Sequence, residues 1–258
     1  MTPYHFFSLV NTQARMGLKA EASRFILSYL WWVIEPLLFV LVFYFVFEVL
    51  LKTGREDFLL FLFCGKIPFL WFSKSVTAAS NSIVQNRGLI NQIDMSKALF
   101  PYVSVHEALY KQWVVFLVLF GMVLFKGYYP TFNWLWLLPL ILVQYGLILV
   151  CSMIGALCVS FVGDFRMLIN MGMMFLMFSS GVFWDINRIS SNQMRDLILT
   201  WNPVAFLIDA YRQVLMYEGI YDVSRLFGLA GVVCVSLVIM HLVLHKNSKL
   251  IAEKVVNL

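Results

Sequence analysis

The chain has 258 residues, a formal net charge of +5, 61% hydrophobic residues and only 13% charged residues. Soluble domains contain about 45–50% apolar residues, so this composition excludes an ordinary soluble domain and indicates an integral membrane protein. The sequence contains no Gly-x-x-x-x-Gly-Lys-Ser/Thr motif, and it therefore offers no P-loop for ATP.

Six apolar runs approach or exceed the length of about 20 residues that a helix needs to cross a bilayer. We expect an all-α membrane protein with one domain over residues 1–258 and spans at 30–51, 58–79, 108–125, 134–161, 168–184 and 226–244. Eleven of the 19 lysines and arginines fall on the face that holds both termini, and seven fall on the other face. Basic residues accumulate in cytoplasmic loops, so both termini are predicted to be cytoplasmic.

The N-terminal segment 1–28 mixes apolar and charged residues and lacks the apolar core of a cleavable signal. This pattern predicts an interfacial amphipathic helix, although an ordinary solvated leader is an open alternative. The first span carries Glu35 and Pro36 near its start, followed by a stripe of Phe39, Phe43 and Phe47 on one face with Tyr44 beside them. Contact with lipid or packing against another helix would explain the stripe equally well.

The second span is interrupted by polar residues, which favours a place inside the protein. Lys66 lies within it, where an unpaired charge is costly, and it would either face a wet cavity or snorkel outward. The connection 80–104 is predicted to form short amphipathic helices outside the membrane, for an external partner or for lipid headgroups. Asp164 and Arg166 occupy the tight turn after the fourth span, as a local salt bridge or a docking contact.

Segment 185–222 contains two half-apolar helical stretches that are too short to cross a bilayer. Asn202 and Pro203 suit the start of the second stretch, and Ser190 with Gln193 suits a capping box for the first. Asp209 and Arg212 are three residues apart and would pair with each other on a helix. We expect two short re-entrant helices in a hairpin seated at the outer surface, marking the mouth of a pathway.

The residues that could act in catalysis or bind a metal are scattered along the sequence. The four cysteines lie in apolar runs without a Cys-x-x-Cys spacing, and the four histidines are far apart. This pattern predicts no metal site, and nothing in it indicates an enzyme that acts alone.

Several motifs, in order along nearly the whole chain, resemble one family. The first span has Leu30-Trp31 and Pro36-Leu37, and the second has Gly65 and residues 68–73. The connection after the second span has Asn86, Leu89-Ile90 and Pro101. The region of the hairpin has residues 178–183 and Asn202-Pro203. They are similar to the permease subunits of type-2 ABC transporters that export O-antigen and capsular polysaccharides from Gram-negative bacteria. The chain departs from the family pattern at Lys66, at Asn91-Gln92 and at Met95-Ser96.

The resemblance implies a homodimer in the bacterial inner membrane, joined to two separate ATPase subunits, that exports a lipid-linked polysaccharide. The chain would need no cofactor, because the partner subunits bind ATP and magnesium, and it would bind no nucleic acid. By this resemblance the channel would be lined by Trp32, Phe39, Phe43, Tyr44, Phe47, Met171, Phe175 and Phe178. The periplasmic gate would comprise Phe183, Trp184, Asn202, Pro203, Asp209 and Arg212, and the ATPase-coupling residues would be Asn86, Arg87, Leu89, Ile90, Asp94, Lys97, Asp164 and Arg166.

Two alternatives stay open at this point. One is a permease of the same fold for another substrate, such as teichoic acid, a drug or a small lipid. The other is a polytopic membrane enzyme that processes glycolipids.

Overall fold

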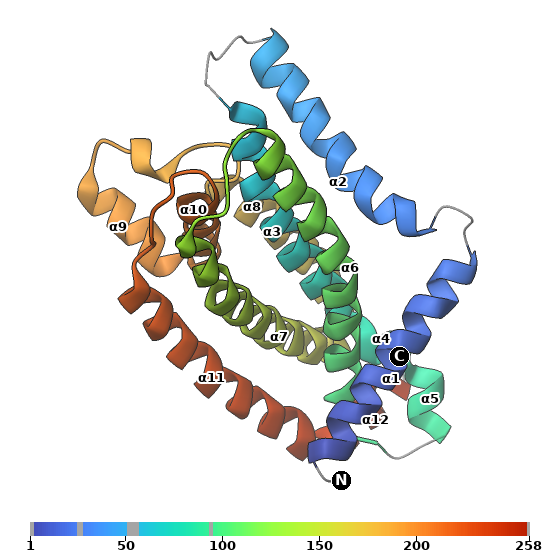
Figure 1. Cartoon of the computed structure of the whole chain (residues 1–258). Helices are drawn as coiled ribbons and strands as arrows, with labels where there is room; N and C mark the ends of the chain where they lie inside the picture. The colour runs from blue at the N-terminus through green and yellow to red at the C-terminus, as the bar shows by residue number, and fades with distance from the viewer. Residues whose placement is uncertain (1–2, 25–27, 51–56, 93–94, 257–258) are drawn as a thin grey trace.

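The computed structural model of the chain describes residues 3–24, 28–50, 57–92 and 95–256, and all regular structure in these ranges is helical. Figure 1 shows the helices as one bundle. They are α1 (Pro3–Arg24), α2 (Ser28–Tyr44), the π-helix η1 (Phe45–Leu50), α3 (Phe58–Ser80), α4 (Ser82–Gln85), α5 (Arg87–Gln92), α6 (Leu99–Phe125), η2 (Phe132–Trp136), α7 (Leu137–Phe161), α8 (Phe165–Ser179), η3 (Ile186–Arg188), α9 (Asn192–Trp201), α10 (Pro203–Leu215), α11 (Val223–Lys246) and α12 (Ser248–Val256).

Within the described residues, four helical stretches are long and apolar enough to cross a membrane: α3, α6, the joined η2 and α7, and α11. The apolar helix α8 has 15 residues. In α2 the helical backbone continues directly into η1, so it covers most of the expected first span. The prediction of an all-α membrane protein is therefore confirmed.

Two helix ends differ from the expected spans. Helix α6 begins at Leu99, nine residues before the expected start of the third span, because Glu107 interrupts the apolar run but not the helix, in which it pairs with Lys111. These two side chains form an i,i+4 ion pair of 3.2 Å. Helix α8 ends at Ser179 rather than at Trp184, because Gly181 adopts a φ of +73°, a left-handed conformation that ends the helix.

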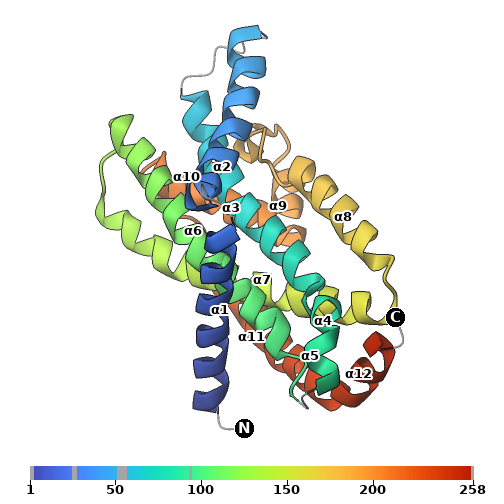
Figure 2. The ribbon, with the colours of Figure 1, turned by 90° about the vertical axis from the view of Figure 1, so that its right-hand side faces the viewer.

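Helix α3 occupies the middle of the bundle, and most of its residues are buried. It packs against α6, α7 and α10, with α2 and α8 on its flanks, while α11 packs on α7 and α1 lies along α6 (Figures 1 and 2). Lys66 is 3% exposed, and its Nζ donates to the sulfur of Met177 on α8 at 2.9 Å. Its ammonium therefore points into the protein rather than outward.

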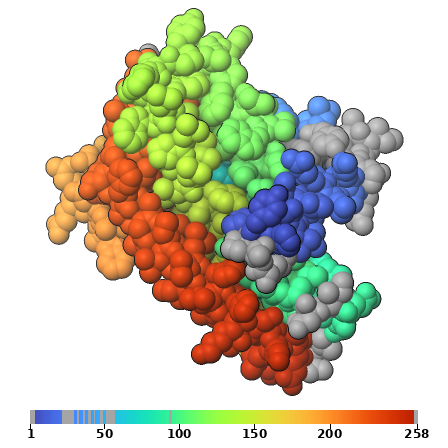
Figure 3. All heavy atoms as spheres, turned by 60° about the horizontal axis from the view of Figure 1, so that its bottom comes forward, coloured from blue at the N-terminus to red at the C-terminus, as the bar shows by residue number. Residues whose placement is uncertain are grey.

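A second, smaller apolar cluster lies at the end of the bundle that holds α4, α5 and α12. Ile251 and Val255 of α12 are fully buried and belong to one cluster with Ile83, Ile90 and Leu244. Figure 3 shows this end of the molecule, with the red C-terminal segment beside the turquoise segment that contains α4 and α5. The C-terminal helix α12 was not predicted from the sequence.

Candidate functional site

Helix α8 presents a continuous apolar face that no other described part of the chain covers. None of its residues is buried. Met171, Phe175 and Phe178, three of the predicted channel residues, are 69%, 73% and 55% exposed. Met167 and Met174 extend the same stripe at helical spacing. Such a face on one protomer needs lipid, a second protein or a pathway to cover it.

The predicted aromatic stripe of the first span lies on α2 and η1. Tyr44, at the junction between them, is partly exposed. The side chains of Trp32, Phe39, Phe43 and Phe47 lie outside what the structure describes. Helices α2 and α8 both pack against α3, on its two flanks, so their placement is compatible with two walls of one pathway.

Arg212 of α10 joins the hairpin to the rest of the bundle. The residue is 1% exposed, and its guanidinium donates to Gly181 O at 2.6 Å, to Val182 O at 2.8 Å and, from two nitrogens, to Phe61 O at 3.3 Å. Its Cζ also lies 3.4 Å from the centroid of the Phe61 ring, a cation–π contact. One side chain therefore holds α10, α3 and the turn after α8 together.

The charge of this group is retained at neutral pH. Burial lowers the pKa of Arg212 to about 10, which leaves the guanidinium protonated at pH 7. Asp209 and Arg212, both in the described part of the chain, form no ion pair. Asp209 instead accepts from Asn187 Nδ2 at 2.8 Å, and burial raises the pKa of this carboxyl although Asn187 and Arg212 oppose the shift.

Gly65 leaves the space that Arg212 occupies. A Cβ at this position would lie 3.1 Å from Arg212 Cζ and 3.3 Å from Val182 O, and it would overlap Arg212 Nη2. We expect Gly65→Ala to lower the free energy of unfolding by about 1–3 kcal/mol, the usual cost of overpacking. The thermal midpoint of the purified protein measures the loss. Gly121→Ala on α6, where a Cβ meets nothing within 4 Å, is the control, and equal midpoints for the two variants would contradict the expectation.

The other predicted gate residues gather around the same turn. Asn202 caps α10 by accepting from Ala205 N at 3.1 Å, and its Nδ2 donates to Ser180 Oγ at 3.0 Å. Pro203 takes the first helical position, as expected. Trp184 Nε1 donates to Phe178 O at 2.7 Å. Phe183 packs its ring against that of Phe178 with centroids 5.5 Å apart.

The two hairpin helices differ in how firmly they are held. Nearly all of α10 is buried against α3 and α7, whereas α9 has no buried residue. Helix α10 is thus packed inside the bundle and α9 is the exposed member of the pair, while the position of the hairpin at the outer membrane surface stays a prediction. Ser191, not Ser190, caps α9, by accepting from Met194 N at 3.3 Å.

The predicted coupling residues divide into an exposed and a buried group. Asn86 and Arg87, at the start of α5, are exposed, and so are Asp164 and Arg166 on the turn between α7 and α8. Within the described ranges, Asp164 and Arg166 form no ion pair with each other. Figure 2 places both segments toward the same end of the bundle. Their exposed polar groups are therefore accessible to a partner at that end.

The remaining coupling residues contribute to packing. Ile90 is buried in the cluster with α12, and Leu89 is partly buried beside it. Lys97 is 2% exposed, and its Nζ donates to Met95 O at 2.9 Å. Asp94 lies outside the described residues.

Sequence reasoning missed the contribution of α12 and the partners of Arg212. The spacing of Ile251 and Val255, four residues apart with charged residues between them, is the signal that predicts a docked helix. No local signal identifies the backbone carbonyls that Arg212 binds, because they lie more than 30 and 150 residues away in the chain. Among the described residues no cluster of histidine, cysteine and carboxylate side chains suits a metal ion.

The four long apolar helical stretches, with α10 buried among them, are those of an integral membrane protein. A model of the ABC-2 type transporter family matches residues 16–216, and the chain belongs to this family. It is therefore a transmembrane subunit of an ABC transporter, as the resemblance predicted. A relative in Klebsiella pneumoniae, the O-antigen export system permease protein RfbA, is 25% identical over 89% of this chain and 88% of its own length.

Two further relatives carry the same description. A second RfbA from Klebsiella pneumoniae is 24% identical over 82% of both chains. The O-antigen export system permease protein RfbA of Myxococcus xanthus is 24% identical over 89% of this chain and 88% of its own. The similarity thus extends over most of the chain in each case.

Proposed function

We propose that this chain is the channel-forming subunit of an ATP-driven exporter that moves a lipid-linked polysaccharide, O-antigen or capsule, from the cytoplasm to the periplasm. The observation that carries the proposal is that three relatives described as O-antigen export permeases align over more than four fifths of the chain. Teichoic acid, a drug or a small lipid are the other substrates that the family fold would accommodate. Family membership favours a transport subunit over the membrane enzyme considered above.

In this proposal six helices span the bacterial inner membrane, with both termini in the cytoplasm. Helices α1, α5 and α12 lie toward one end of the bundle, which supports a common side for the termini and the coupling segment. Two copies of the chain form the channel, and two ATPase subunits bind ATP and magnesium. The uncovered face of α8 provides a surface that a second copy and the substrate would cover.

Sugar rings present apolar faces that stack on aromatic side chains, and conduction requires that each contact be weak. The methionines and phenylalanines of α8 supply such contacts without fixed hydrogen bonds. Motion of the ATPases would reach the chain at Asn86, Arg87, Asp164 and Arg166, which are exposed. At the outer end α9, which has no fully buried residue and contacts the core through the partly buried Leu199, is better suited than α10 to move as a gate.

The lining of the channel is tested by a double substitution, Phe175→Asp with Phe178→Asp. We expect surface polysaccharide to fall at least about tenfold, because carboxylates on this face would bind water and sugar hydroxyls too firmly for passage. The measurement is surface glycan in cells together with recovery of the ATPase on purification of the permease. Recovery should be unchanged, because these side chains are exposed and distant from the coupling segment.

Phe132→Asp is the matched control, since this phenylalanine is 84% exposed but lies in η2, away from α8. Wild-type glycan export by the double variant would refute the channel lining. Purification of the chain without an ATPase subunit, under conditions that preserve such complexes, would contradict the exporter itself.

A further inference from the structure

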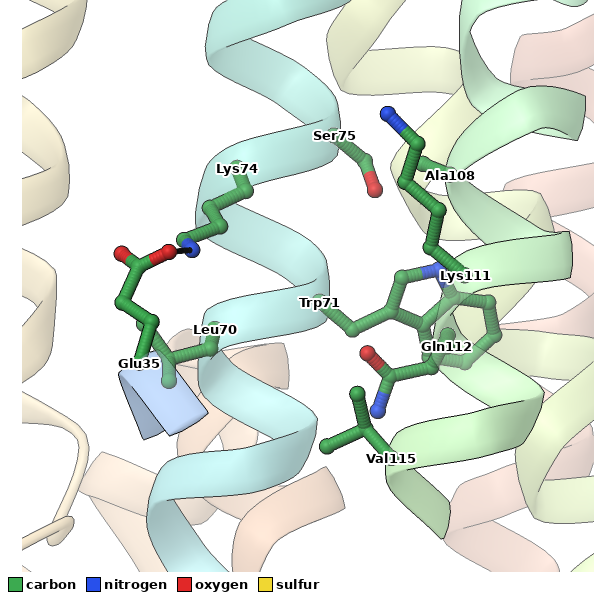
Figure 4. Close-up of a pocket in the computed structure, with 9 residues that line it drawn as sticks. All are labelled: Glu35, Leu70, Trp71, Lys74, Ser75, Ala108, Lys111, Gln112 and Val115. Carbon is green, nitrogen blue, oxygen red and sulfur yellow. Dashed lines mark ion pairs between the residues drawn. The ribbon is translucent and has the colours of Figure 1, made fainter. Parts of the chain in front are cut away.

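A small cavity lies between α2, α3 and α6. It has a volume of about 110 Å³, and Figure 4 shows Trp71 and Ser75 reaching from α3 toward α6, opposite Gln112. A water molecule needs roughly 10–15 Å³ by this measure, so the cavity has room for several waters or for one small polyatomic group. Its lining residues are Glu35, Leu70, Trp71, Lys74, Ser75, Ala108, Lys111, Gln112 and Val115.

Three buried polar groups line this cavity without a hydrogen-bond partner among the described residues. They are Trp71 Nε1, Ser75 Oγ and Gln112 Nε2, on side chains that are 2%, 1% and 6% exposed. The indole and amide nitrogens can only donate, and the hydroxyl can donate as well. Buried polar groups in native proteins are almost always satisfied, so the cavity is built for a ligand with acceptor oxygens.

The cavity lies at the level where charged side chains begin. Glu35 pairs with Lys74 on the α2 side, and both side chains are about half exposed, at 50% and 52%. On the α6 side Lys111 pairs with Glu107 at 3.2 Å and with Glu21 of α1. One turn deeper, Ile67 of α3 and Phe116 of α6 are buried and apolar, and the charged residue at that depth is the buried Lys66. Apart from Lys66, this change from paired charges to apolar side chains is typical of the headgroup level of a membrane, where lipid phosphates lie.

We propose that the cavity binds a phosphate group, presented by the headgroup of a membrane phospholipid. Phosphate oxygens only accept hydrogen bonds, which matches a cavity lined by three donor groups without a partner among the described residues, and one phosphate fits the volume. Lys74 and Lys111, at the rim of the cavity, are already paired with Glu35 and Glu107. The phosphate would therefore be recognised by the neutral donors inside the cavity and not by an unpaired positive charge. The half-exposed Glu35 and Lys74 leave the cavity open toward the lipid side of α3.

This site does not depend on what the transporter exports, and its test measures lipid binding only. The purified full chain in tetraethylene glycol monooctyl ether micelles is titrated with dioctanoyl-phosphatidylglycerol, and bound lipid is counted by native mass spectrometry. Parallel titrations use dioctanoylglycerol, inorganic phosphate and octyl maltoside. We expect the phospholipid to bind at least about tenfold more tightly than dioctanoylglycerol, because the latter lacks the acceptor oxygens of phosphate.

Binding is then compared in Trp71→Phe with Gln112→Met, which removes both nitrogen donors and keeps the side-chain volumes. The variant should bind the phospholipid at least about tenfold more weakly. Trp113→Phe with Gln193→Met, at two exposed positions, should leave binding unchanged. Inorganic phosphate that displaces the phospholipid would support the phosphate site and assign it to a free ion. Equal binding of dioctanoylglycerol, preference for octyl maltoside, or an unaffected donor variant would each overturn the proposal.

Discussion

Replacing Arg212 by methionine is expected to lower the free energy of unfolding by about 3–5 kcal/mol and to abolish export. The change removes the side-chain donor from three backbone carbonyls, of which Gly181 O and Val182 O lie outside any helix, whereas Phe61 O lies inside α3. Each unsatisfied group costs about 1–3 kcal/mol. The loss should appear as a lower thermal midpoint of the detergent-solubilised protein and as a smaller monodisperse fraction.

Arg188→Met serves as the control, because this arginine is in the same hairpin region but its side chain is 70% exposed. Arg212→Lys should fall between Arg212→Met and the wild type, since one ammonium cannot reproduce the fork of a guanidinium. If Arg212→Met kept the thermal midpoint of Arg188→Met, the hydrogen bonds to the three carbonyls would not hold the hairpin in place.

Replacing Ile251 by aspartate is expected to reduce export at least about tenfold while the membrane bundle stays folded. A carboxylate cannot occupy the fully buried site beside Ile83 and Ile90, so α12 should leave α5. The coupling segment would then lose the surface that orients it toward an ATPase. This expectation rests on the proposed function, and it is checked by recovery of the ATPase and by surface glycan in the same cells.

Leu250→Asp makes the same chemical change one residue earlier, at a position that is 46% exposed. It should therefore behave like the wild type in both measurements. Loss of export in both variants alike would indicate an effect of added charge rather than of undocking. A wild-type result for Ile251→Asp would show that α12 does not support coupling.

The sequence predicts the helices well because their signal is local. Apolar runs identify the spans, and Asn202 with Pro203 marks the start of α10 without any knowledge of the fold. Helix ends were less predictable where charges lie inside a helix. Glu107 and Lys111 form an ion pair inside α6. Hydropathy alone instead predicts that the membrane span begins after Glu107.

The candidate site was less predictable because its contacts join distant segments. The spacing of Asp209 and Arg212 predicts a local pair, yet Arg212 binds carbonyls of α3 and of the turn after α8. Arg212 binds these carbonyls rather than pairing with Asp209 because it is buried. A guanidinium inside the bundle needs several acceptors at once.

The way in which α8 is attached has a mechanical consequence. Its C-terminal end is tied by Trp184 to Phe178 O and by Asn202 to Ser180, while Asp164 at its other end is exposed. With 15 residues at about 1.5 Å each, the helix is a rod of roughly 22 Å. A force applied at the Asp164 end would therefore rotate α8 about its C-terminal end near Ser180. Small movements of the Asp164 end would shift the methionine face sideways while the Ser180 end stayed in place.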